Sequence, residues 1–83
     1  MEALRIRNHI RRLRFEFGEM TQQALAEHAG VTRQTIVAIE GAKYSPSLEL
    51  AFRIAHAFHK PLEEVFQSDA GTGWVAPADR GPS

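Results

Sequence analysis

Residues 22–41 read QQALAEHAGVTRQTIVAIEG, and this stretch decides the fold of the 83-residue chain. It predicts two short helices, the first capped by Thr21 and the second by Thr32, with only Gly30 and Val31 between the first helix and Thr32. So short a connection makes the helices cross sharply, which needs the small Ala26 at their contact and a glycine of positive φ in the turn. This spacing is typical of a helix-turn-helix motif.

The apolar positions of these two helices predict a shared core. They fall at Leu25, Ala29, Val31, Ile36 and Ile39. The other side chains of the second helix are left on its outward face, which carries Arg33, Gln34, Thr35, Val37 and Ala38.

Three further helices are predicted around the motif. An apolar stripe at Ile6, Ile10, Leu13 and Phe17 predicts a first helix that ends at Gly18. Another two follow the motif over residues 48–58 and 62–66, begun by Ser47 and Pro61. No stretch shows sustained apolar–polar alternation, so no β-sheet is predicted. The expected fold class is all-α, with five helices.

The composition divides the chain into a domain and a tail. Residues 1–67 form the predicted domain, and residues 68–83, SDAGTGWVAPADRGPS, are rich in Gly, Pro and Ser. Such a segment buries too little apolar surface to order itself, so a short irregular tail is expected. Trp74 and Val75 are two adjacent apolar residues in this tail, and we expect them to pack near a dimer interface or over the last helix.

The ten basic and ten acidic side chains give zero formal net charge, whereas nucleic-acid-binding domains usually carry a basic excess. The distribution is uneven, however. Residues 1–43 hold seven basic and five acidic side chains, and residues 44–83 hold three and five. The basic half contains the helix-turn-helix motif, so the neutral total still permits DNA binding.

Several functional classes have no support in the sequence. There is no cysteine, no Gly-x-Ser-x-Gly segment and no phosphate-binding glycine loop, so an enzyme is not expected. His56 and His59 lie three residues apart, but two ligands alone make a poor metal site. No cofactor, metal, small-molecule ligand or membrane span is predicted, and the absence of cysteine fits a reducing cytoplasm.

The chain resembles the phage-repressor-like, or XRE, helix-turn-helix regulators. The resemblance covers residues 6–66 and is carried by MTQQALAEHAGVTRQTIVAIE, KYSPSLELAFRIAHAF and PLEEVF. It implies a phage-repressor-like fold and a transcriptional regulator, expected to act as a repressor. It also implies a bacterial, cytoplasmic and nucleoid-associated protein that binds double-stranded operator DNA of palindromic sequence as a homodimer.

The resemblance also implies roles for particular residues. Arg33, Gln34, Thr35 and Ala38 match positions that face bases in the major groove. The positions expected to face phosphates are Gln22, Thr32, Lys43, Tyr44 and, from the basic first helix, Arg14. The chemistry of these side chains fits the implied roles. Arg can bind the edge of guanine, and Gln the edge of adenine, in bidentate fashion, and helix N-termini attract phosphates.

Dimerisation is expected through the fourth and fifth helices and the tail. The residues concerned are Phe52, Phe58, Leu62, Val65, Phe66 and Trp74, placed partly in the core and partly at the interface. The alternative is a protein-interaction module of the same fold, of the antitoxin or coactivator type. The presence of Gln22 and of the Arg33-Gln34-Thr35 sequence favours DNA.

Two departures from the family pattern affect the backbone. Gly41-Ala42 stands where Asn-Gly is common, so the glycine has moved by one position. His59 replaces the usual glycine after the fourth helix and is expected in the left-handed conformation, which is uncommon but tolerated.

Overall fold

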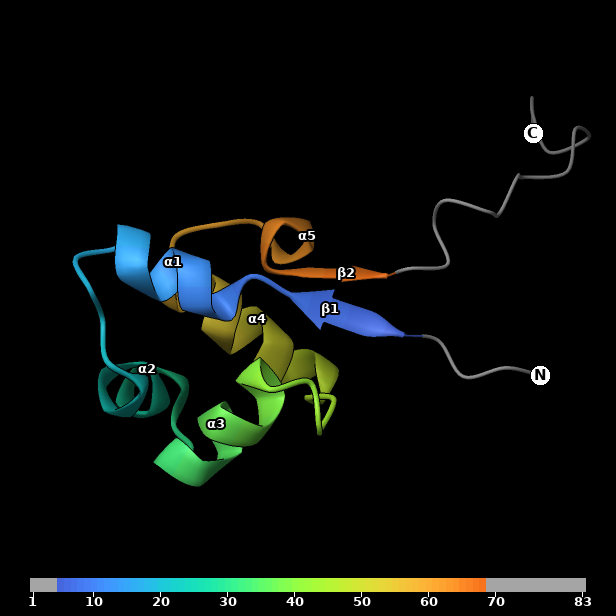
Figure 1. Cartoon of the computed structure of the whole chain (residues 1–83), viewed down its shortest axis with the longest axis horizontal. Helices are drawn as coiled ribbons and strands as arrows, with labels where there is room; N and C mark the ends of the chain where they lie inside the picture. The colour runs from blue at the N-terminus through green and yellow to red at the C-terminus, as the bar shows by residue number, and fades with distance from the viewer. Residues whose placement is uncertain (1–4, 69–83) are drawn as a thin grey trace, which may run out of the picture.

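The computed structural model describes residues 5–68, which form five helices and two short strands. The helices are α1 (Ile10–Glu16), α2 (Gln22–Ala29), α3 (Arg33–Glu40), α4 (Leu48–Ala57) and α5 (Leu62–Val65), and the strands are β1 (Ile6–Asn8) and β2 (Phe66–Ser68). Figure 1 shows α4 in the middle, with α1, α5 and the strands above it and α2 and α3 below. Trp74 lies outside the described residues.

The helix-turn-helix core forms as predicted. Ala26, at the crossing of α2 and α3, is fully buried. The buried residues of the two helices also include Leu25, Ala29, Ile36 and Ile39, and Val31 packs against them half-buried. The core continues into α1 and α4. None of the helices within residues 5–68 is long and apolar enough to cross a membrane.

The predicted caps of α2, α3 and α4 are formed. The hydroxyl oxygens of Thr21, Thr32 and Ser47 accept hydrogen bonds from the backbone N–H three residues further on, at 2.9, 3.2 and 3.1 Å. Each such cap stabilises a helix by about 1 kcal/mol. Helix α1 begins differently, because the Oδ1 of Asn8 accepts from the backbone N–H of Ile10 at 3.1 Å.

The two strands form an antiparallel sheet that the sequence did not predict. Its pairs are Ile6 with Ser68, Arg7 with Gln67 and Asn8 with Phe66. The first helix therefore begins at Ile10, and the expectation that Ile6 belongs to its apolar stripe is wrong. Three-residue strands are too short for an alternating pattern to be recognised. The sheet is minor, and the fold remains an all-α helix-turn-helix domain.

The predicted turn residues adopt left-handed backbone conformations. Gly18 and Gly30 both have φ of 76°, and His59, where the family commonly has glycine, has φ of 55°. After α3, Gly41 has an ordinary φ of −81°, and the left-handed position falls on Ala42 at 60°. The shifted glycine thus leaves an alanine in a conformation that favours glycine.

Candidate nucleic-acid interface

The outward face of α3 is continuous and open to solvent. Ile36 and Ile39 point into the core. The opposite face holds residues at i, i+3, i+4 and i+7, namely Gln34, Val37, Ala38 and Gly41. Gln34 and Gly41 are exposed, Ala38 is half-buried, and Val37 keeps 43% of its surface exposed. Val37 was not among the predicted base contacts, although helical periodicity already places it outward.

The start of α3 is joined to the start of α2 by a side-chain hydrogen bond. The Nη2 of Arg33 donates to the Oε1 of Gln22 at 3.4 Å. Both side chains lie at helix N-termini, where free N–H groups favour an anion. The contact leaves the amide N–H donors of Gln22 and most of the Arg33 guanidinium available to a ligand.

The two threonines beside Arg33 hold each other. The hydroxyls of Thr32 and Thr35 lie 3.1 Å apart, and Thr35 is half-buried whereas Thr32 is exposed. Thr35 therefore sits at the edge of the outward face rather than at its centre.

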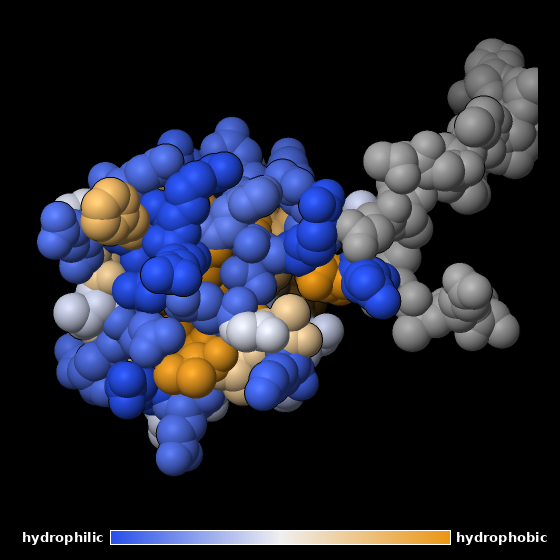
Figure 2. All heavy atoms as spheres, viewed as in Figure 1, coloured by the Kyte–Doolittle hydropathy of each residue, from blue (hydrophilic) through white to orange (hydrophobic). Residues whose placement is uncertain are grey.

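A groove runs between α1, the start of α2 and α3. Its lining includes Arg11, Arg12, Gln22, Val37, Glu40 and Gly41. A second hollow beside it is lined by Arg33, Thr21 and Gln23 together with Arg11. Figure 2 shows this side of the molecule as largely hydrophilic, with a hydrophobic island over α3.

The floor of this groove contains an ion pair between α1 and α3. The Nε and Nη2 of Arg14 donate to the two carboxylate oxygens of Glu40 at 3.0 and 2.9 Å, and its Nη1 donates to the Met20 carbonyl at 2.9 Å. Only 18% and 13% of the two charged side chains are exposed. This geometry favours a positioning role for Arg14 over the predicted phosphate contact.

A second contact fixes the end of α3. The Nδ2 of Asn8 donates to the backbone carbonyl of Ile39 at 3.0 Å, and more weakly to that of Glu40 at 3.4 Å. Because Asn8 also begins α1, one side chain connects β1, α1 and the last turn of α3. Nothing in the local sequence signals this contact, which joins residues 31 positions apart.

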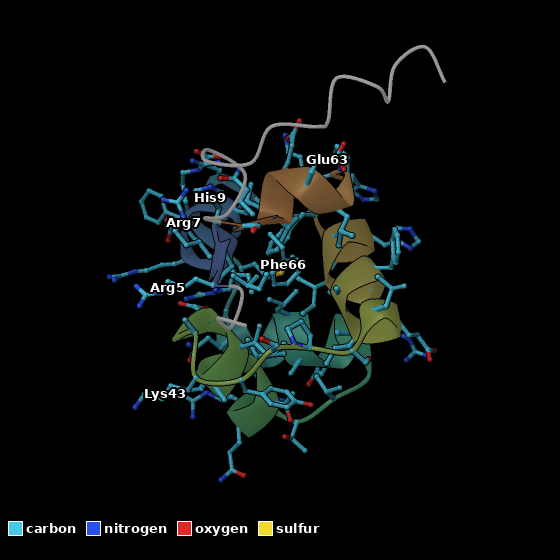
Figure 3. All side chains as sticks on the ribbon, turned by 90° about the vertical axis from the view of Figure 1, so that its right-hand side faces the viewer. Arg5, Arg7, His9, Lys43, Glu63 and Phe66 are labelled. Atoms are coloured by element: carbon cyan, nitrogen blue, oxygen red, sulfur yellow. The ribbon has the colours of Figure 1, made fainter. Side chains whose placement is uncertain are left out.

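The loop after α3 adds a basic edge to the interface. The backbone N–H of Lys43 donates to the Ala38 carbonyl at 2.9 Å, which holds the loop against the helix. The Lys43 side chain is exposed, and Tyr44 is 50% exposed. In Figure 3, Lys43 extends on the same side of the molecule as Arg5 and Arg7 of the N-terminal segment.

A family model described as helix-turn-helix matches residues 18–65, which is more than half of the chain. The chain belongs to the helix-turn-helix family of transcriptional regulators. The XRE-type resemblance predicted from the sequence is thereby confirmed.

Curated relatives of similar length share much of this helix-turn-helix sequence. An uncharacterized HTH-type transcriptional regulator of Archaeoglobus fulgidus is 45% identical over 83% of this chain and 97% of its own length. One from Methanothermobacter thermautotrophicus is 52% identical over 77% and 93%. The uncharacterized HTH-type regulator YgzD of Bacillus subtilis is 48% identical over 74% and 91%.

The residues predicted at a dimer interface of this helix-turn-helix regulator fall into two groups. Phe58 and Val65 are 1% and 0% exposed, so they belong to the protomer's own core and have no surface to offer a partner. Phe52 is 44% exposed, and Leu62 and Phe66 are half-buried. Phe58 and Val65 are thus core members of the predicted set, the interface role of Phe52, Leu62 and Phe66 stays a prediction, and Trp74 lies outside the described residues.

An apolar groove adjoins that second group. It lies between α4, α5 and the sheet, and its lining includes Ile6, Pro46, Leu48, Ala51, Leu62 and Phe66. Leu48 is 69% exposed and precedes Phe52 by four residues, so both share one face of α4. Leu48 was missed at this surface, because its spacing also fits the core stripe of the helix.

Two histidines of the helix-turn-helix domain, His56 and His59, lie beside aromatic rings. The His56 ring lies 6.4 Å from that of Phe52, and the His59 ring lies 5.7 Å from that of Phe17. Within residues 5–68, no group of three or more His, Asp or Glu side chains could hold a metal ion.

Proposed function

We propose that this regulator binds operator DNA with α3 in the major groove and represses the gene whose promoter it occupies. The observation that carries the proposal is the pair Arg33 and Gln22. Two side chains suited to base and phosphate recognition are hydrogen-bonded to each other at adjacent helix N-termini on an open face.

Base contacts are assigned to the first turn of α3 and the residues beyond it. Arg33 suits the O6 and N7 edge of guanine, and Gln34 suits the N6 and N7 edge of adenine. Thr35 and Ala38 would add apolar contacts at the edge of this set. Because Gln22 restrains Arg33 before binding, less side-chain freedom is lost when the complex forms.

Phosphate contacts are assigned to residues that flank α3. Gln22 and Thr32 lie at helix N-termini on one side, and Lys43 and Tyr44 lie in the loop on the other. Arg11 lines the groove beside Gln22 and is exposed, so it replaces Arg14 in this group. These contacts would set the register on the duplex without reading its sequence.

A homodimer would place two α3 helices on successive major grooves. For a palindromic operator this requires a spacing of about 34 Å, one turn of DNA. The apolar groove beside α4 and α5 supports this assembly, since it shares no lining residue with the groove between α1 and α3 and includes the exposed Leu48, with the exposed Phe52 on the same face of α4.

The test begins with selection of binding sites from random duplex DNA, followed by affinity measurements on the selected site and on scrambled DNA. Arg33→Ala is expected to weaken binding to the selected site by about 1–3 kcal/mol and to relax preference at one base pair. Lys43→Ala is expected to weaken binding to both duplexes by a similar factor and to reduce the salt dependence of the affinity.

The comparison of these two variants separates base reading from phosphate contact. An equal loss for Arg33→Ala on both duplexes would remove its assigned base contact. Failure to select any DNA sequence, with retained binding to a protein partner, would instead favour the protein-interaction module.

A further inference from the structure

Val37 is the one large apolar side chain of α3 that is exposed. Ile36 and Ile39 fill the core, whereas Val37 keeps 43% of its surface in solvent. It lines a groove whose other residues are mostly polar, with Phe15 and Met20 as the further large apolar ones. The hydrophobic island over α3 in Figure 2 lies within a hydrophilic surface.

The position of Val37 on the helix is central to the proposed DNA contact. Val37 follows Gln34 by three residues and precedes Gly41 by four, and these three exposed residues share the face opposite the core. The advance along the helix from Gln34 to Val37 is about 4.5 Å. Base pairs in DNA are spaced by about 3.4 Å along the duplex axis, so Val37 falls within two base pairs of the pair that Gln34 reads, however α3 is inclined in the groove.

The edges of base pairs in the major groove offer an aliphatic side chain a single methyl group, the C5-methyl of thymine. The groups that distinguish the other bases there are hydrogen-bond donors and acceptors, which Val37 cannot satisfy. We propose that Val37 determines specificity by packing on a thymine methyl, so that each half-site carries a thymine within two base pairs of the base read by Gln34.

This inference rests on the proposed DNA-binding function and adds a base identity to it. Gly41 supports the assignment, because the absent side chain one turn beyond Val37 leaves room for the duplex to approach. A β-carbon at Gly41 would meet only backbone carbonyls of α3 within 4 Å, the nearer being that of Val37 at 3.3 Å. The outward side of this position is therefore open.

The experiment uses the whole chain and a duplex selected from random DNA. Each thymine of the half-site is replaced in turn by deoxyuridine, which removes the methyl group and keeps the base-pairing edge. One replacement is expected to weaken binding by about fourfold, the factor that corresponds to one buried methyl group. With Val37→Ala, that same replacement is expected to have little effect, since the partner of the methyl is gone.

Phe17→Ala provides the matched control. Phe17 is exposed to nearly the same degree as Val37, at 42% against 43%, but it does not line this groove, so this variant should respond to the deoxyuridine replacement as the unaltered protein does. Thermal unfolding checks that both variants remain folded.

Two results would overturn the inference. If no thymine methyl affects affinity, or if Val37→Ala responds to its removal as strongly as the unaltered protein, Val37 does not read thymine, although DNA binding stands. If the chain selects no DNA sequence at all, the proposed function fails and this inference fails with it.

Discussion

Three non-glycine residues among those described hold left-handed backbone conformations. Glu19, Ala42 and His59 have φ of 57°, 60° and 55°. An L-residue in this region is disfavoured by about 1–2 kcal/mol relative to the right-handed conformation. Ala42 is the clearest case, because its short side chain cannot form a compensating hydrogen bond.

Replacing Ala42 with glycine is expected to stabilise the protein. Relief of the strained conformation outweighs the extra freedom that glycine gains in the unfolded chain, for a net increase of about 0.5–1 kcal/mol in the free energy of unfolding. Urea denaturation measures this change. Ala42→Val is the control and should be destabilising, since a branched β-carbon tolerates positive φ poorly. A decrease for Ala42→Gly would show that the turn stores no strain.

Residue-scale features were predictable where local chemistry decides them. The caps at Thr21, Thr32 and Ser47 follow from their immediate neighbours in sequence, and the conformation of His59 follows from the family pattern, which commonly has glycine at this position. The contacts of Arg14 and Asn8 do not, because each side chain meets an element more than 20 residues away. A basic run alone could not tell an arginine that binds phosphate from one that holds a helix.

At the scale of elements, different neighbours hold the two ends of α3. Its last turn is held by residues of α1 and β1, and its first residue by α2. Arg14 and Asn8 both reach its last turn, through Glu40 and the Ile39 carbonyl. These contacts set the angle at which α3 leaves the body of the protein. The five helices were predictable from periodicity and caps, whereas this bracing depends on tertiary packing that periodicity does not report.

Removing the Asn8 side chain tests the bracing. Asn8→Ala leaves the Ile39 carbonyl and the Ile10 N–H without this partner, and it is expected to lower the free energy of unfolding by about 1–3 kcal/mol. Hydrogen exchange should quicken in the last turn of α3 more than in α4. Gln67→Ala, on the exposed face of β2, is the comparison. Uniform exchange changes across all helices would argue for general destabilisation instead.

At the scale of the whole molecule, two surfaces of different chemistry lie apart. The groove along α1 and α3 is hydrophilic and contains arginines, and the groove along α4 and α5 is apolar. The uneven distribution of charge along the chain predicted a basic half and an acidic half, but it did not predict this apolar groove. Its details were beyond sequence reasoning, because Phe58 and Leu48 both fit an apolar stripe, and only packing shows which of them is buried.

Leu48→Glu tests the apolar surface. A charge placed at this exposed position should oppose association while leaving the protomer folded, because Leu48 contributes little to the core. Sedimentation equilibrium is expected to show at least tenfold weaker dimerisation, the factor for about 1.4 kcal/mol. Phe15→Glu, which is equally exposed at 69% on α1, should leave association unchanged. Equal behaviour of the two variants would remove α4 from the proposed interface.

The small sheet has a consequence for how the chain acquires its structure. Ile6 pairs with Ser68, so the first described strand stays without its partner until nearly the whole domain has emerged from the ribosome. Helices α2 and α3 can pack against each other before that. Asn8, however, lies on β1, and β1 can pair only after β2 has been synthesised. Final alignment of α3 is therefore a late event in synthesis, and a nascent chain truncated before Phe66 should lack it.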